Sequence, residues 1–295
     1  MVTVSRRVVD GRTYFYLAHS IRHGRRVEKR ERYLGTAVPK DVERIKREFM
    51  DDIYREMWFG DLDRTKAGYA RQRKVLPPSA REKAMEAFAT TYTYNTNRIE
   101  GSRLTLRETA ELLERGIAPG SRPLADIKEA EAHRDAFYEM LRYERDLSMQ
   151  TLLHFHRQLL RATKPDIAGK LREHQVGITG SRFLPPMPVE VNPLLVEFFR
   201  WYARRRGKMH PVELAALVHL GLVTIHPFTD GNGRVSRLMM NHVLNRHGYP
   251  MLDIPYVRRG GYYRALERAQ VSGDDDIFLH WFFKRYVAEN RRYID

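Results

Sequence analysis

The fold of this chain is decided by the stretch His226-Pro227-Phe228-Thr229-Asp230-Gly231-Asn232-Gly233-Arg234-Val235-Ser236-Arg237. Apolar residues recur with helical spacing before it, from Leu214 to Ile225. A proline disfavours helical backbone at the residue that precedes it, so Pro227 predicts that this helix ends at His226. The sequence therefore places a histidine at the end of a helix, facing a loop.

A second helix is predicted after the loop. Val235, Met239 and Val243 form an apolar ridge at helical spacing. Arg234 and Arg237 are three residues apart, which puts both guanidinium groups on another face of the same helix. Two arginines that point the same way are suited to the oxygens of a phosphate.

The residue types of the loop are those of a phosphate site. Gly231 and Gly233 allow the backbone to curl with its N–H groups inward, and the following helix adds its positive end. Asp230 offers a carboxylate for Mg²⁺, and His226 offers a general base. Each feature alone is more often a helix end, a turn or a solvated face, but few structural demands would bring all of them together.

The stretch resembles the signature of the Fic family, His-x-Phe-x-Asp/Glu-Gly-Asn-Gly-Arg-x-x-Arg, and it matches every fixed position. The resemblance implies a mainly α, Fic-type helical enzyme that transfers AMP from ATP to a protein hydroxyl and releases pyrophosphate. It also implies ATP as the substrate, Mg²⁺ as the cofactor, and a target protein with an exposed Ser, Thr or Tyr as the partner. Nucleotidyl transfer needs mainly positioning and charge neutralisation, which these residues supply.

The resemblance assigns a role to each fixed position. His226 would deprotonate the target hydroxyl, Asp230 would hold Mg²⁺ against the α- and β-phosphates, and Phe228 would pack the loop on the core. The phosphate-binding positions would be the anion hole of Gly231, Asn232 and Gly233, with Arg234 for the β-phosphate and Arg237 for the γ-phosphate.

An upstream segment, Thr96-Asn97-Arg98-Ile99-Glu100-Gly101, ends a helix that is predicted from Ser79. Its Thr-x-x-x-Glu-Gly pattern resembles the inhibitory helix of many Fic proteins. Thr96 and Glu100 share one helical face, and the resemblance makes Arg237 the partner of the Glu100 carboxylate. The plain alternative is that Glu100 is a surface residue and Gly101 a helix cap.

Residues 168–191 break the helical pattern with several glycines and prolines, so we expect a β-hairpin loop. It resembles the family's flap, in which Ile178, Thr179 and Gly180 would pair with the backbone of the target. The alternative is an ordinary connecting loop. Farther along, the Tyr-Tyr-x-x-Leu run resembles the segment that borders adenine, and Tyr263 is the residue expected to stack on the ring. The family often has Asn where this chain has Gln270.

Further helices are predicted by pattern, and one of them opens with a capping box at Thr105-Leu106-Arg107-Glu108. His154 and His156 are two residues apart and face different sides of a helix, so we interpret them as structural. The ranges of the other predicted helices are 39–59, 124–145, 148–162, 192–206, 211–225, 260–266 and 277–287.

The N-terminal region is strongly basic. The chain has 295 residues and a net charge of +15, and residues 1–40 hold ten Lys or Arg and three acidic residues, a net charge of +7. Aromatic and β-branched runs around Tyr16 and Tyr33 predict a small hairpin or three-stranded unit. Cations interleaved with tyrosines are typical of nucleic-acid binding, although charges also keep exposed strand edges soluble.

These observations give the domain organisation and the functional hypotheses. We expect a basic β-hairpin and helix module at 1–60, a polar linker at 61–78, and a Fic-type catalytic domain at 79–295. The chain has no cysteine and no apolar run of membrane-spanning length, so we expect a cytoplasmic protein without a membrane partner. The first hypothesis is an adenylyltransferase autoinhibited by Glu100. The alternatives are a hydrolase that removes AMP with the same pocket, and a nucleic-acid-associated regulator that only senses nucleotide.

Overall fold

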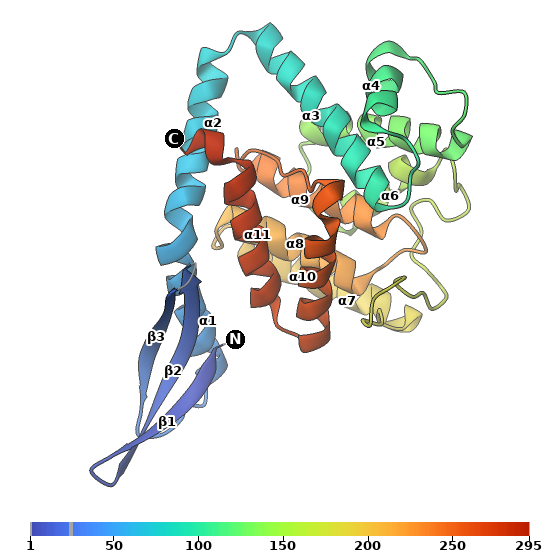
Figure 1. Cartoon of the computed structure of the whole chain (residues 1–295). Helices are drawn as coiled ribbons and strands as arrows, with labels where there is room; N and C mark the ends of the chain where they lie inside the picture. The colour runs from blue at the N-terminus through green and yellow to red at the C-terminus, as the bar shows by residue number, and fades with distance from the viewer. Residues whose placement is uncertain (1, 24–25, 295) are drawn as a thin grey trace. The chain divides into compact units, whose positions relative to one another are not determined.

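The computed structural model describes residues 2–23 and 26–294 (Figure 1). The chain divides into two compact units, Met1–Asp63 and Arg64–Asp295. Each unit has its own secondary structure and core, and each is described by itself.

The first unit contains a three-stranded antiparallel sheet of β1 (Thr3–Val9), β2 (Arg12–His23) and β3 (Arg26–Gly35), in the order β1-β2-β3. Val9 pairs with Arg12 across a two-residue turn in which Asp10 and Gly11 have φ values of 49° and 74°. Positive φ at both turn positions matches the right-handed twist of the strands, which explains the Asp-Gly pair. The predicted three-stranded unit is confirmed, while Gly24 in the second turn lies outside the described residues.

Helix α1 (Val42–Tyr54) and a π-helical turn, Arg55–Phe59, follow the sheet, as the pattern at 39–59 predicts. The buried side chains of this unit include Leu17 and Ile21 from the sheet and Phe49 and Ile53 from α1. The Arg32 guanidinium lies 5.3 Å from the centre of the Phe49 ring. Apolar burial and this stacking hold β2, β3 and α1 together.

The polar linker predicted at 61–78 is corrected by the structure, because Gly60–Val75 forms helix α2. The buried positions of this stretch include Leu62, Thr65 and Gly68, at three-residue spacing. Only Leu62 among the three is a large apolar residue, so the buried side of this helix does not show in the sequence as a helical period of apolar residues. A Cβ at Gly68 would overlap the backbone carbonyl of Tyr293, so glycine permits a close approach of α2 to the end of the chain.

The second unit is helical, and the mainly α prediction is confirmed (Figure 1). After α2 its helices are α3 (Pro78–Ile99), α4 (Leu106–Arg115), α5 (Leu124–Arg142), α6 (Met149–Leu160), α7 (Pro188–Arg205), α8 (Pro211–Ile225), α9 (Asn232–Arg246), α10 (Arg259–Ser272) and α11 (Asp275–Glu289). Across the described residues, none of these helices is both long and apolar enough to cross a lipid bilayer.

Helices α8 and α9 form the centre of this unit, and most residues of both are buried. They pack on each other, α8 also packs on α7 and α11, and α9 on α3, α5 and α6 (Figure 1). The loop from His226 to Gly231 joins the two central helices, so a rigid core fixes both of its ends. The predicted end of α8 before His226 is confirmed.

The end of α3 is followed by a well-formed turn into α4. The Thr105 hydroxyl accepts a hydrogen bond from the Glu108 backbone N–H at 3.2 Å, and the Glu108 carboxylate accepts one from the Thr105 N–H at 2.8 Å. This is the predicted capping box, and such a cap contributes about 1 kcal/mol. It limits the freedom of the segment that follows Glu100.

The β-hairpin predicted at 168–191 is wrong, because the described residues between α6 and α7 contain no strand and α7 already begins at Pro188. Side chains bind carbonyl groups that a hairpin would pair. Arg172 donates to the Pro186 carbonyl at 2.5 Å and Gln175 donates to the Pro185 carbonyl at 2.9 Å. Prolines also lack the N–H that a β-ladder needs, so this segment is an extended loop.

Candidate active site

His226 stands at the C-terminal end of α8 in a left-handed conformation, with φ 51° and ψ 58°. Such a backbone is uncommon for a residue with a side chain and turns the chain sharply into the loop. Nδ1 of His226 lies 3.2 Å from the Val223 carbonyl, which assigns the proton to Nδ1 and leaves the Nε2 lone pair available. Burial lowers the pKa of His226, so the imidazole is neutral at pH 7 and able to accept a proton.

Phe228 and His156 fix the loop by packing and hydrogen bonds. Phe228 is fully buried and stacks on the His156 ring, with 3.6 Å between centroids and 5° between planes. His156 Nε2 lies 2.9 Å from the Asp230 carbonyl, and its Nδ1 accepts the Gly169 N–H at 2.9 Å. Burial lowers the pKa of His156 to about 4, and a neutral ring has the one donor and one acceptor that these contacts require. The structural role predicted for His156 is confirmed, as is the packing of Phe228.

Asn232 braces the loop with its side chain and opens α9 with its backbone. Its amide oxygen accepts the Phe228 N–H at 2.9 Å, and its amide nitrogen donates to the Phe228 carbonyl at 2.8 Å. Gly231 has a φ of 79° and caps the helix, so α9 begins at Asn232. The first N–H groups of a helix have no intrahelical acceptor, so those of Asn232, Gly233 and Arg234 are suited to an anion.

Arg172 ties the loop to the segment before α7, and nothing in the sequence pattern singles it out. Its Nε donates to the His226 carbonyl at 2.8 Å, and its own N–H donates to the Pro227 carbonyl at 3.0 Å. The side chain reaches Pro186 as well, and the residue is 3% exposed. These bonds fix the backbone that carries the histidine, so Arg172 is a positioning residue.

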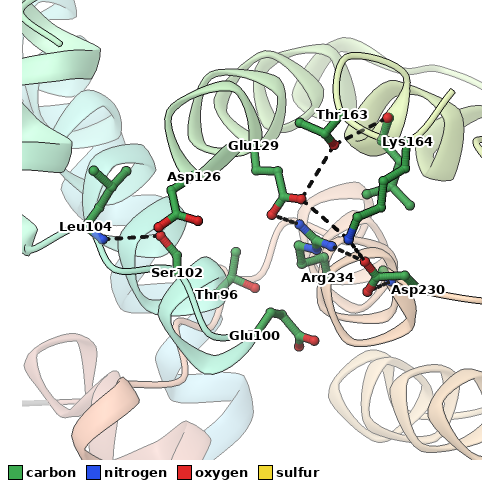
Figure 2. A network of polar contacts seen from close by, with 12 residues as sticks. Thr96, Glu100, Ser102, Leu104, Asp126, Glu129, Thr163, Lys164, Asp230 and Arg234 are labelled. Carbon is green, nitrogen blue, oxygen red and sulfur yellow. Dashed lines mark hydrogen bonds and ion pairs between the residues drawn. The ribbon is translucent and has the colours of Figure 1, made fainter. Parts of the chain in front are cut away.

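Asp230 and Arg234 belong to a cluster of charges with two residues that the sequence reading missed, Glu129 of α5 and Lys164 (Figure 2). Asp230 forms an ion pair with Lys164 and lies 3.4 Å from Arg234. Arg234 also forms an ion pair with Glu129. Burial opposes the charged form of Asp230, but Arg234 and Lys164 outweigh it and hold the pKa of this carboxyl below its usual range.

Arg237 is held by the two residues of the predicted inhibitory segment. Its Nε donates to the Thr96 hydroxyl at 2.5 Å, and its Nη2 donates to the Thr96 carbonyl at 3.0 Å and to Glu100 Oε1 at 2.7 Å. The residue is 1% exposed. Burial disfavours the guanidinium charge, yet the ion pair with Glu100 raises the pKa of Arg237. The two arginines therefore share a helix but hold different carboxylates.

The Glu100 carboxylate lies against the first turn of α9. Gly233 has no side chain, and a Cβ at that position would overlap Glu100 Oε1 and crowd Nη1 of Arg237. Gly101, with a φ of 101°, then turns the chain away after α3. The carboxylate thus lies beside the N–H groups and the guanidinium that a phosphate would use. Figure 2 shows Thr96 and Glu100 at the end of α3.

The remaining predicted residues lie around this centre. Tyr263 is 44% exposed, and its hydroxyl donates to the Ile99 carbonyl at 3.0 Å, next to Glu100. Gln270 donates to the Thr224 hydroxyl at 3.2 Å. In the flap Ile178 is half-buried, and Thr179 and Gly180 are exposed. The flap is turned by a bond from the Ser181 N–H to the Ile178 carbonyl at 3.0 Å.

The described residues contain no group of three His, Cys, Asp or Glu side chains that could hold a metal ion by themselves. Asp230 is nevertheless suited to Mg²⁺, since its side chain is 33% exposed at the mouth of the charge cluster. Mg²⁺ is commonly bound through one or two carboxylates together with substrate phosphates. The residues therefore fit a metal that arrives with a nucleotide.

Comparisons with known proteins agree with this geometry. Residues 146–244 match the Fic/DOC family. Over 200 residues, 66% of this chain and 39% of the relative, the sequence is 36% identical to a curated protein named "Protein adenylyltransferase Fic" from Drosophila ananassae. The chain spans about two fifths of the length of the curated relatives it matches.

Solved structures show the same fold. A Fic domain containing signaling protein from Bacteroides thetaiotaomicron superposes with a TM-score of 0.71 at 27% identity, covering 79% of this chain and 95% of that one. Fic-1 from C. elegans superposes with a TM-score of 0.69 at 28% identity, covering 87% and 77%. The loop, the two central helices and these likenesses lead to one conclusion: the helical unit of this chain contains a Fic-type domain, which matches the Fic/DOC family over residues 146–244.

Proposed function

We propose that this protein transfers AMP from ATP to a Ser, Thr or Tyr hydroxyl of a target protein. The observation that carries the proposal is a neutral His226, with Nε2 available, one short loop away from the free N–H groups of α9. A base beside an anion site meets the two needs of nucleotidyl transfer, which are removal of the hydroxyl proton and stabilisation of phosphate charge. The Drosophila relative named protein adenylyltransferase supports the proposal.

Each residue has its own role in the proposed reaction. His226 takes the proton of the target hydroxyl, and the backbone of Gly231, Asn232 and Gly233 receives the phosphates together with Arg234 and Arg237. Asp230 would hold Mg²⁺, which neutralises phosphate charge when it is bound.

Tyr263 would stack on adenine. Gln270 lies farther along α10, where its side chain donates to the Thr224 hydroxyl. The flap residues Ile178, Thr179 and Gly180 would add the target backbone as a strand. The exposure of Thr179 and Gly180 leaves their backbone open to such pairing.

We also propose that the activity is autoinhibited. Glu100 bonds Arg237 at 2.7 Å and lies against Gly233, so its negative charge competes with the terminal phosphate for the same donors. ATP would then bind without the contact that orients its γ-phosphate.

The second enzymatic candidate is removal of AMP from a modified protein. The Glu100 carboxylate is 27% exposed beside the first turn of α9, and in this candidate it would orient a water molecule in the same pocket. Glu100→Gly separates the candidates, because it should raise AMP transfer but abolish AMP removal.

The proposal is tested with cell lysate, Mg²⁺ and ATP labelled at either the α- or the γ-phosphate. Glu100→Gly protein should label a lysate protein from α-labelled ATP alone, and Glu100→Gly with His226→Ala should not. Label from the γ-position would indicate phosphoryl transfer instead, and no label from either would contradict the proposal.

For residues 1–40 we propose nucleic acid as a second partner. Tyr16 and Tyr33 are cross-strand neighbours with ring centres 5.3 Å apart, and Arg7 lies 4.8 Å over the Tyr16 ring. Tyr33 is exposed and Tyr16 is half-buried, and an exposed ring near a guanidinium is suited to stacking on bases. The ion pairs that Arg7 and Lys29 form with Glu31 reduce the charge available for phosphate contacts.

The absence of cysteine supports a cytoplasmic location.

A further inference from the structure

Lys164 is a cation at the mouth of the site that the Fic signature does not include. It follows α6, and its backbone is fixed on both sides, since its N–H donates to the Leu160 carbonyl at 2.7 Å and its carbonyl accepts the Ala168 N–H at 3.2 Å. The ammonium forms an ion pair with Asp230 and lies 3.9 Å from Glu129 (Figure 2). The side chain is 43% exposed, so a ligand can reach it.

The charge cluster is balanced without a metal. Lys164 and Arg234 carry the positive charges, and Asp230 and Glu129 carry the negative ones. Both oxygens of Asp230 are already in use, because Oδ1 accepts the Gly231 N–H at 2.5 Å and Oδ2 accepts from Lys164 and Arg234. Oδ2 thus has two donors, and a metal that binds this oxygen displaces one of them.

Lys164 is the partner that can leave. Its side chain is 43% exposed and ends a flexible stem, whereas the Arg234 side chain is 3% exposed and also bonded to Glu129. A phosphate oxygen that shares a metal with Asp230 lies beside that carboxylate, which is where the ammonium of Lys164 stands. Lysine is a well-suited phosphate binder because its charge is compact and can turn.

We propose that Lys164 is a phosphate-binding residue of this site: when ATP enters, its ammonium moves from Asp230 to the nucleotide phosphates, and it binds them even without a divalent metal. The inference rests on the proposed function, because it concerns the same ATP site. Lys164 then has two opposed effects in the presence of Mg²⁺. It adds a phosphate contact, and it competes with the metal for Asp230.

Calorimetric titration with ATP, in EDTA and in Mg²⁺, tests this in the full chain carrying Glu100→Gly. Lys164→Met keeps the stem and removes the charge, and Lys170→Met is the matched control on an exposed lysine of the same segment. Lys164→Met should weaken metal-free ATP binding about tenfold or more. It should weaken binding in Mg²⁺ less than threefold, because the lost contact is offset by easier metal binding at Asp230. Lys170→Met should change neither.

Equal weakening in EDTA and Mg²⁺, or no weakening in either, would overturn the inference while the proposed function stands. If the Glu100→Gly parent binds no ATP in either buffer, the proposed function fails and the inference fails with it. Thermal unfolding of each variant shows whether it is folded. Lys164→Arg provides the second variant, since it retains a cation and should keep metal-free binding.

Discussion

Replacing Glu100 by glycine should tighten ATP binding, and the size of the effect follows from its contact with Arg237. The substitution removes a charge-assisted hydrogen bond of 2.7 Å and leaves the two bonds from Arg237 to Thr96 in place. Such a bond contributes about 1.5–3 kcal/mol and must be broken before the γ-phosphate can use the guanidinium. The expected gain in ATP affinity is therefore about 10- to 150-fold.

The same substitution should lower the stability of the nucleotide-free protein. Arg237 is 1% exposed, and its charge loses its carboxylate partner. An unpaired buried charge is costly, about 3–5 kcal/mol when a partner is removed, although the bonds to Thr96 reduce that cost here. The unfolding temperature of Glu100→Gly should thus fall without ligand and rise more with ATP than that of the wild type.

Calorimetric titration with ATP and with AMP measures the effect. AMP has no γ-phosphate, so its affinity should change less than threefold. Glu100→Gln is the matched control, because it keeps the volume of the side chain and loses the charge, and it should give a smaller gain than glycine. Unchanged ATP affinity in the folded glycine variant, or an equal gain for AMP, would refute the competition between Glu100 and the γ-phosphate.

The other predictions concern the base, the pH dependence and the N-terminal unit. His226→Ala should lower AMP transfer by about 10²–10⁴ in rate and leave ATP affinity within a few-fold, as measured by transfer assay and calorimetry; equal loss of both would make the residue structural. Burial lowers the pKa of His133 and of His219 to about 3 in the folded protein, from an ordinary value of 6.5. Below pH 6.5 these histidines therefore bind more protons in the unfolded chain than in the folded one. Stability to urea should therefore fall as pH is lowered from 7 towards 4, and a flat profile would contradict this. The full chain should bind nucleic acid in gel shift with affinity that falls linearly in log salt, and Tyr33→Ala should weaken it; no shift at low salt would leave the basic charge without this role.

The sequence predicts the central helices and the ends of the loop because their signals are local. Pro227 ends α8, and the Gly231 and Gly233 positions allow the turn and the close approach that the structure contains. The pairing of Glu100 with Arg237 is predicted only through the resemblance, since no local rule joins residues so far apart in the chain. Helix α2 is missed because its buried side includes Thr65 and Gly68, which carry no apolar period.

The missed site residues are those whose role depends on tertiary contact alone. Glu129, Lys164 and Arg172 are ordinary charged residues in the sequence, and only the packing of α5 and the segment after α6 brings them to the loop. The hairpin expected in the flap fails for a related reason. Its carbonyls are bound by the side chains of Arg172 and Gln175, a competition that composition does not reveal.

The central claim is that His226 and the phosphate site act together in AMP transfer and that Glu100 restrains them. Intact-mass measurement of the purified protein after incubation with Mg²⁺ and ATP tests it most directly. Glu100→Gly protein should gain the mass of one or more AMP groups, the wild type should gain far less, and Glu100→Gly with His226→Ala should gain none while still binding ATP. Equal modification of the wild type and Glu100→Gly, or modification that persists without His226, would contradict the account.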